Sequence, residues 1–587
     1  MLATLKTCIL VAALTPALLC AQGIASRGVK PQPRGKPSGI PFPVRFADAG
    51  ESAGLTGVSF YGPVDRADYI VETSGGGVAF IDFDNDGWLD IFVLTGSRFD
   101  GSAGDAVNRL YRNRGDGTFE DVTQKAGLAQ GGWAMSVAAG DIDNDGWEDL
   151  FVAYWGQNRL YHNRKGTFAD ITGQAGLTAA RSEPPLWGSG ATFIDYDRDG
   201  DLDLFVANYI DFDPKKTPKP GGSSNCNWKG VPVACGPRGL APGRLWFFEN
   251  QGNLRFADVS DRSGVSKIRG SYAMTAVAVD IDADGWTDIY VAGDSTPSLL
   301  LRNTGKGTFI DEGLERGIAL NDDGMEQAGM GIGAGDFNLD GHLDLFKTHF
   351  SDDTNILYRN DGKGNFRDDT ISSGLAVETR FVGWGAAIAD LDNDGLPDLF
   401  YVTGNVYPET GKRLPAYPYK TPRVVFRNLG GGKLEQFIEQ AGPGVAGAHS
   451  SRGAAFGDFD NDGDIDAVVL NLNERPSLLR NDNSASHRWI KLLLTGSESN
   501  RSAIGAKVVL RYGGRVQAQT VMSQSSFYSV NDRRLHFGLG KEESASVTIH
   551  WPNGRRETYQ NLPAGRLITI REGEGVVKSE TLARQVK

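Results

Sequence analysis

The sequence predicts an all-β protein: a seven-bladed β-propeller closed by its N-terminal strand and followed by a small all-β domain. Three observations lead to this prediction. An acidic loop recurs seven times, a strand motif and a phenylalanine motif recur between the loops, and glycine supplies 77 of the 587 residues. Glycine at recurring turn positions favours many short strands, and a long repeat period favours a ring of similar sheets.

The acidic loop spans nine residues. The first copy, from Asp82, reads DFDNDGWLD, and the other six start at Asp141, Asp195, Asp280, Asp336, Asp390 and Asp458. Aspartate fills 27 of the 28 first, third, fifth and ninth positions, with Asn338 as the exception, and glycine fills every sixth position. Strands such as 91–94 follow the loops, so each loop is expected to connect two strands of a hairpin.

This spacing suits a hard divalent cation. Alternate carboxylates converge on one point, the glycine permits a sharp turn, and the seventh-position carbonyl can complete the shell of oxygens. An EF-hand closes with glutamate at position twelve, whereas Val93 and Lys347 are examples of position twelve here, so the ninth aspartate is expected to close the loop. Good turns without metal are the alternative. Repulsion among four carboxylates per loop favours Ca²⁺, at about seven sites.

The expected calcium ligands follow one scheme. Side chains at positions one, three, five and nine supply oxygen ligands, and position seven supplies its backbone carbonyl. Where position seven is tryptophan, the ring is expected to pack against the protein rather than to bind a sugar. No catalytic residue and no other cofactor is assigned. The ligands are Asp82, Asp84, Asp86, Trp88, Asp90, Asp141, Asp143, Asp145, Trp147, Asp149, Asp195, Asp197, Asp199, Asp201, Asp203, Asp280, Asp282, Asp284, Trp286, Asp288, Asp336, Asn338, Asp340, His342, Asp344, Asp390, Asp392, Asp394, Leu396, Asp398, Asp458, Asp460, Asp462, Asp464 and Asp466.

Two incomplete motifs predict how the ring closes. Between loops, an LYRN-like strand and a glycine turn precede a phenylalanine unit such as FEDVTQKAGL from Phe119. A phenylalanine unit from Phe46 lacks the preceding strand, whereas LLRN at 478–481 lacks the following unit. The two halves complete each other if the N-terminal strand finishes the last blade, and closure removes exposed sheet edges.

The chain ends indicate an exported protein. Residues 1–21 resemble a secretory signal peptide, with Lys6 before an apolar run, and residues 22–43 form a proline- and glycine-rich linker. Cys20 leaves a lipoprotein anchor as a minor alternative. No later segment has the 18 apolar residues that a membrane span needs. We expect a secreted or cell-surface protein, periplasmic if the source is Gram-negative.

Charge and cysteine content narrow the partners. The formal net charge of -13 argues against nucleic acid, because phosphate binding needs concentrated lysine and arginine. An extracellular protein or polysaccharide is the expected partner. Cys226 and Cys235 lie nine positions apart and are expected to form a disulfide in an oxidising compartment, rather than a metal site or a catalytic thiol.

The motifs also carry a resemblance. The DxDxDGxxD loops, over residues 44–483, resemble the FG-GAP or VCBS repeats of integrin α-chain propellers. Within residues 484–573, NRSAIGAKVVLRYGGRVQ and VTIHWPNGR resemble the ASPIC/UnbV domain, and residues 574–587 are expected to be a flexible tail. The combination resembles the extracellular cartilage acidic protein family. It implies structural calcium at the matching aspartates, with a weaker fifth site at Asn338, but no integrin ligand.

The expected function is that of an extracellular binding or adhesion module. The longest insertions, 95–107, 211–243 and 404–422, follow the strands leaving the acidic loops, and their aromatic residues would form a ligand face. Catalytic motifs such as HExxH and GxSxG are absent. The alternative is a polysaccharide hydrolase or lyase using the central channel. Titrating carboxylates or histidines at the channel mouth would favour the enzyme, whereas a plugged channel together with an aromatic patch on the insertions would favour binding. The expected ligand-face residues are Trp228, Tyr407, Tyr417 and Tyr419.

Overall fold

The computed structural model describes residues 27–104, 106–178 and 185–582. The expected signal peptide, residues 1–21, lies outside the described residues. Strands dominate, and the helices are single turns. Among the described residues, no helix is both long and apolar enough to cross a membrane. The α-helices of the described residues are α1 (Val71–Ser74), α2 (Thr123–Ala126), α3 (Thr370–Ser373), α4 (Thr410–Arg413) and α5 (Pro443–Ala446), and the 3-10 helices are η1 (Ser224–Cys226), η2 (Val265–Lys267), η3 (Leu375–Val377) and η4 (Glu439–Ala441).

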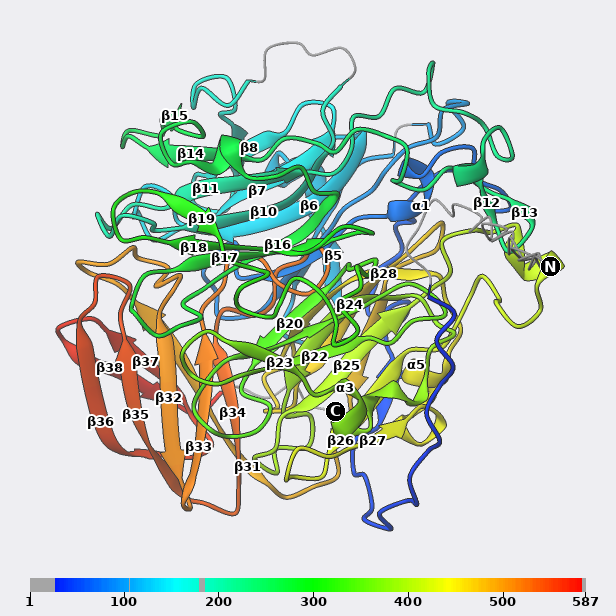
Figure 1. The fold of residues 1–587 in the computed structure, drawn as a ribbon. Coiled ribbons are helices and arrows are strands. Elements are labelled where there is room, and N and C mark those ends of the chain that lie inside the picture. Colours follow the sequence, from blue (N-terminus) through cyan, green and yellow to red (C-terminus); the bar gives the residue numbers. More distant parts are fainter. Residues whose placement is uncertain (1–26, 105, 179–184, 583–587) are drawn as a thin grey trace, which may run out of the picture.

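The described residues between 46 and 481 form seven four-stranded antiparallel sheets and one two-stranded hairpin. Figure 1 shows how the sheets are arranged. The hairpin, β12 (Asn227–Trp228) with β13 (Val231–Pro232), lies in an insertion of the third sheet. The sheets, written from the first strand outward, are β2 (Val78–Ile81), β3 (Asp90–Val93), β4 (Arg109–Asn113), β5 (Phe119–Asp121); β6 (Trp133–Gly140), β7 (Asp149–Trp155), β8 (Arg159–Asn163), β9 (Phe168–Asp170); β10 (Gly188–Ile194), β11 (Asp203–Asn208), β14 (Trp246–Asn250), β15 (Phe256–Asp258); β16 (Ala273–Val279), β17 (Asp288–Gly293), β18 (Leu299–Asn303), β19 (Phe309–Asp311); β20 (Ile332–Gly335), β21 (Asp344–Lys347), β22 (Ile356–Asn360), β23 (Phe366–Asp368); β24 (Gly383–Ala389), β25 (Asp398–Thr403), β26 (Val424–Asn428), β27 (Leu434–Phe437); and β28 (Ser451–Gly457), β29 (Asp466–Asn471), β30 (Ser477–Asn481), β1 (Phe46–Asp48).

The N-terminal strand completes the seventh sheet. β1 pairs with β30 in the register Phe46↔Asn481, which is the pairing expected from the two incomplete motifs. The first strands of successive sheets also contact one another, and β28 contacts both β24 before it and β2 at the start of the series. The strand nearest the N-terminus is therefore held by the strand nearest the end of the repeats.

The C-terminal domain consists of two further four-stranded sheets, drawn in orange and red in Figure 1. Residues 575–580, expected to belong to a flexible tail, instead form a strand that pairs with its neighbour through Leu567↔Glu580. Gly573 and Gly575 have φ of 75° and 89°, so the chain can fold back there. The two sheets are β34 (Leu535–Gly540), β31 (Arg488–Thr495), β37 (Leu567–Arg571), β38 (Gly575–Glu580) and β33 (Arg515–Thr520), β32 (Lys507–Tyr512), β35 (Ser544–His550), β36 (Arg556–Pro563).

A connection of the C-terminal domain runs among the first strands of the repeat sheets. This central segment, residues 521–534, joins β33 to β34. The Tyr528 carbonyl accepts the Val137 N–H of β6 at 3.0 Å, and the Val530 carbonyl accepts the Phe80 N–H of β2 at 3.0 Å. On the other side, Ser526 exchanges backbone hydrogen bonds with Ile332 of β20. The central segment thus fills the space between sheets that are distant in sequence.

Small residues permit this close approach. All eight residues of β6, which reads WAMSVAAG, are buried. Gly77 precedes β2, and a Cβ atom at this position would lie 1.8 Å from the Tyr528 carbonyl oxygen. A larger residue would push the central segment away from the strand. Part of the glycine excess therefore serves backbone packing at the centre rather than turns.

Candidate metal centres

In the acidic loops other than the third, the N–H of the sixth-position glycine donates to the first aspartate. The carboxylate of Asp82 accepts the Asp86 N–H at 2.9 Å and the Gly87 N–H at 3.0 Å, and Asp86 accepts the Trp88 N–H at 3.0 Å. All seven sixth-position glycines have φ between 86° and 97°, a region that disfavours other residues. The glycine is thus required because the loop turns back on its own carboxylate. These are Gly87, Gly146, Gly200, Gly285, Gly341, Gly395 and Gly463.

The ninth aspartate anchors the loop to the sheet. Asp90 is fully buried, and its carboxylate accepts the Asn113 N–H of β4 at 2.8 Å and the Phe83 N–H of the loop at 3.2 Å. Burial raises the pKa of Asp90 well above its ordinary value. The other ninth aspartates also accept the N–H of an asparagine that ends the third strand of their sheet: Asp149, Asp203, Asp288, Asp344, Asp398 and Asp466.

The predicted ligands converge within single loops. Carboxylate oxygens of Asp82, Asp84 and Asp86 lie within 4.8 Å of one another. The same holds for three further loops, in the sets Asp141, Asp143, Asp149; Asp195, Asp197, Asp199; and Asp280, Asp282, Asp288. Hard oxygen donors grouped in this way are the donor set that calcium prefers.

The first aspartates are poorly solvated as anions. Asp195 is 4% exposed, and its carboxylate oxygens accept no hydrogen bond of good geometry, although the backbone N–H groups of Gly200 and Arg198 lie near them. Burial, followed by the charges of Asp199 and Asp197, raises its pKa to about 7. Burial likewise raises the pKa of Asp82 to about 6 and that of Asp336 to about 7. A divalent cation would supply the positive charge that these buried carboxylates lack.

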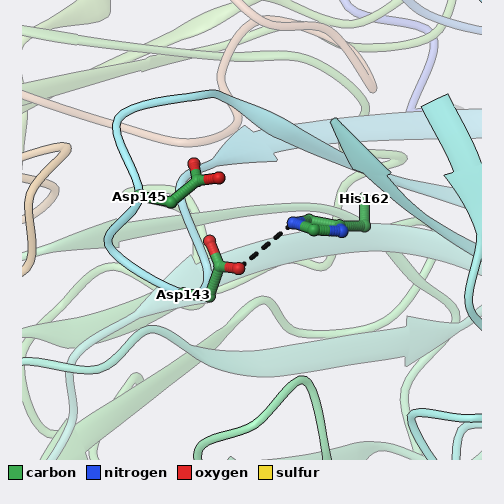
Figure 2. Close-up of side chains that lie close together, drawn as sticks. All are labelled: Asp143, Asp145 and His162. Atoms are coloured by element: carbon green, nitrogen blue, oxygen red, sulfur yellow. Dashed lines mark ion pairs between the residues drawn. The ribbon is translucent and has the colours of Figure 1, made fainter. Parts of the chain in front are cut away.

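The second loop contains an imidazole that the sequence analysis did not single out. His162 in β8 points toward the loop, and its Nε2 lies 3.1 Å from the Asp143 Oδ2 (Figure 2). Ligand atoms of Asp143, Asp145 and His162 lie within 4.8 Å of one another. Imidazole is a ligand for zinc and other transition metals, whereas calcium takes oxygen. The equivalent position of the first sheet holds Arg112, which pairs with loop carboxylates instead.

The seventh loop contains a built-in cation. Lys491 of β31 donates to the Asp458 carboxylate, and both side chains are buried. Burial alone would raise the pKa of Asp458, but Lys491 and then Arg534 outweigh it and lower that pKa below its ordinary value. Among the first aspartates, the pKa is raised in the other six loops: Asp82, Asp141, Asp195, Asp280, Asp336 and Asp390.

Asparagines join each loop to the next sheet, and the sequence analysis overlooked them. Asn163 ends β8, and its Nδ2 donates to the Phe83 carbonyl of the first loop at 2.9 Å. Asn113 makes the corresponding bond to the Phe459 carbonyl of the seventh loop at 2.9 Å. The asparagine that ends each LYRN-like motif in the sequence was the signal that could have identified these links. The other members are Asn250, Asn303, Asn360, Asn428 and Asn481.

The insertions do not present the predicted aromatic face. Trp228 is 2% exposed and Tyr407 1% exposed, so these two rings cannot form an exposed contact surface as expected. They are buried because they pack in one hydrophobic cluster: Trp228 lies 5.0 Å from Tyr417 and 5.5 Å from Phe350, measured between ring centroids. Tyr417 and Tyr419 are half-buried. A disulfide joins Cys226 and Cys235, as expected.

Comparison with known families agrees with this architecture. Residues 82–152, 141–206, 280–347 and 336–401 match the FG-GAP-like repeat, and residues 496–577 match ASPIC and UnbV. The chain carries FG-GAP-like repeats and an ASPIC/UnbV domain. The resemblance expected from the motifs is therefore confirmed.

Curated relatives match most of this chain. Cartilage acidic protein 1 of Homo sapiens is 25% identical over 474 residues, covering 75% of this chain and 63% of the relative. The Mus musculus protein is 26% identical over 515 residues, which cover 82% of this chain and 70% of the relative. This chain thus spans less than two thirds of the human protein's length. Among solved structures, an Agrocybe aegerita lectin recognising terminal N-acetylglucosamine is 18% identical, covering 62% of this chain and 82% of the lectin, with a TM-score of 0.35.

Proposed function

We propose that the FG-GAP-like repeats form a closed seven-bladed propeller, stabilised by calcium in its acidic loops, and that the chain is an extracellular binding or adhesion module. Two observations support the closed ring. The first strands contact one another in a series that returns from β28 to β2. The Asn113 side chain of the first sheet donates to the Phe459 carbonyl of the seventh.

Calcium has a structural role in this proposal. Bound in a loop, it would neutralise carboxylates that burial and mutual repulsion otherwise destabilise. The chain's own groups do the rest: backbone N–H groups orient the first aspartate, and the ninth aspartate fixes the loop to its sheet. The loops are therefore expected to hold neighbouring blades together rather than to contact a ligand.

The observation that favours binding over catalysis is the filled centre. The central segment, residues 521–534, occupies the space where a propeller enzyme would admit its substrate. The cavity beside it measures about 100 Å³, below the roughly 300–1,000 Å³ of typical ligand pockets. The Phe527 ring of the central segment also packs against Trp384 of β24, with ring centroids 4.9 Å apart.

A channel hydrolase or lyase would also need accessible titratable groups. Lys347 and His349 have the required chemistry, since burial lowers the pKa of Lys347 to about 7 and that of His349 well below its ordinary value. Each is 1% exposed. A polymeric substrate could not reach either group without opening the structure, so the enzyme alternative has less support than binding.

The test is a binding panel that also scores chemistry. Calcium-loaded protein is incubated with extracellular polysaccharides and proteins, and both retention and chemical change are measured. A Phe99→Ser/Lys216→Glu variant alters exposed insertion residues, and Ile371→Ser, 70% exposed in α3, is the matched control. We expect retention without chemical change, reduced at least tenfold in the insertion variant only. Chemical conversion of any panel member would support the enzyme alternative. Equal retention of the ligand by all variants would exclude the insertions as the binding surface.

A further inference from the structure

The seventh acidic loop, residues 458–466, differs from the others because the C-terminal domain reaches into it. Lys491 lies in β31, and its ammonium group forms an ion pair with the Asp458 carboxylate. The side chains of Lys491 and Asp458 are 1% and 0% exposed. Neighbouring strands pair with β31 on both sides of Lys491, at His536 and Leu567. The ammonium group of this buried lysine therefore cannot reach solvent.

The hydrogen bonds of Asp458 leave little room for a metal. Its Oδ2 accepts the Gly463 N–H at 2.8 Å as well as the Lys491 Nζ, and these two donors use both lone pairs of that oxygen. Its Oδ1 accepts the Asp462 N–H at 3.0 Å. The positions that the loop itself would leave to a cation are thus partly taken by an amine of the same chain.

A second cation lies on the other side of this loop. The Arg534 guanidinium, at the end of the central segment, donates to the Asp458 carbonyl and to the Asn461 Oδ1, each at 3.0 Å. Arg534 is also paired with Asp532 at 2.9 Å. Because Asp532 offsets the charge of Arg534, the uncompensated positive charge at the buried end of the loop is that of Lys491, and Arg534 adds hydrogen bonds that hold the loop backbone.

The other loops lack this arrangement. In the described part of the chain, the remaining first aspartates have no ion pair within 4.0 Å apart from Arg501, which lies at that limit from Asp141 and is 44% exposed. Where a cation touches another loop, it meets the third and fifth aspartates: Arg112 lies 2.5 Å from Asp84 and 2.8 Å from Asp86. Among the described residues, Lys491 is the only buried cation that pairs with a first aspartate.

We propose that Lys491 takes the place of calcium in the seventh loop, so that six loops bind calcium and the seventh is neutralised from within. This inference rests on the calcium part of the proposed function. It gives the seventh sheet a distinct property, since that sheet contains both β1 and β30, where the two ends of the repeats meet. A tethered lysine would keep this junction closed at any calcium concentration.

Native mass spectrometry of the full chain in 1 mM calcium tests the inference. We expect six bound ions in the wild type and one additional ion in Lys491→Met. The control is Lys507→Met, because Lys507 is also a buried lysine of the C-terminal domain, at 8% exposure, whose charge acts on Asp280 and Asp336 without an ion pair within 4.0 Å among the described residues. Its count should equal that of the wild type. Seven ions in the wild type, or no gain in Lys491→Met, would overturn the inference.

A second pair of variants covers the case in which Lys491→Met fails to fold. Asp458→Asn should keep the wild-type count of calcium ions, whereas Asp195→Asn in the third loop should lose one ion. Loss of an ion in Asp458→Asn would contradict a lysine-filled loop. A wild-type protein that binds no calcium at all would instead overturn the calcium part of the proposed function, and this inference with it.

Discussion

At the scale of single residues, the acidic loops combine burial with dense negative charge. The spacing of aspartates and glycine predicted which residues converge, because a nine-residue loop is a local structure. The sequence did not distinguish the seventh loop, since its cation comes from Lys491, which lies 33 positions from Asp458 and in another domain. Long-range partners of this kind leave no mark in the periodicity of either segment.

Asp195→Asn should have opposite effects with and without calcium. In 1 mM calcium the variant loses one site, which lowers the free energy of unfolding by about 1.4 kcal/mol if the site binds at about 10⁻⁴ M. Without metal the neutral amide relieves the cost of a buried carboxylate that is 4% exposed, so the variant should be at least as stable as wild type. Chemical denaturation under both conditions measures this. A loss of equal size in both conditions would contradict a metal role for Asp195.

The metal-free protein should lose stability as the pH rises. Burial raises the folded-state pKa of Asp82 and Asp141 to about 6 and of Asp195 and Asp336 to about 7, above the ordinary value of 3.8. The folded state therefore binds more protons than the unfolded state between about pH 4 and pH 7, and stability falls across that window. Melting curves of metal-stripped protein at pH 5 and pH 8 test this. Calcium should remove the difference in melting temperature between pH 5 and pH 8. Higher stability of the metal-free protein at pH 8 than at pH 5 would contradict this prediction.

At the scale of elements, local patterns predicted the repeat strands better than the connections. Two incomplete motifs predicted that β1 pairs with β30, since each half lacked what the other supplied. The role of the central segment was missed because VMSQSSFYSVNDRR has neither strand alternation nor a helical period. Its conformation depends on the strands around it. The insertion aromatics were placed on the surface because composition alone does not report which side of a loop is covered.

The asparagine links should stabilise neighbouring sheets independently of metal. Asn163→Ala removes the donor to the Phe83 carbonyl and leaves that buried group unpaired. The expected cost is about 1–3 kcal/mol of unfolding free energy. Denaturant titration with and without calcium should give the same loss. A loss confined to the calcium-loaded protein would instead assign Asn163 to the metal loop.

At the scale of the whole molecule, the two domains form one packed structure. Phe527 and Tyr528 of the central segment belong to the same hydrophobic core as residues of β2, β24 and β28. A chain ending at residue 483 would leave the centre of the repeats empty. We expect that chain to lose the cooperative melting transition of the full-length protein, as followed by calorimetry. A truncated chain that melts like the full-length protein would show that the central segment is dispensable.

The central claim is that calcium in the acidic loops stabilises this fold, and calorimetry of the full chain tests it most directly. The melt is recorded in 1 mM calcium and again after the metal is removed by a chelator. Each occupied site should add about 1.4 kcal/mol if it binds at about 10⁻⁴ M, so several sites should raise the melting temperature sharply. We expect one cooperative transition that moves to a lower temperature without calcium. An unchanged melt, together with no bound metal, would contradict it.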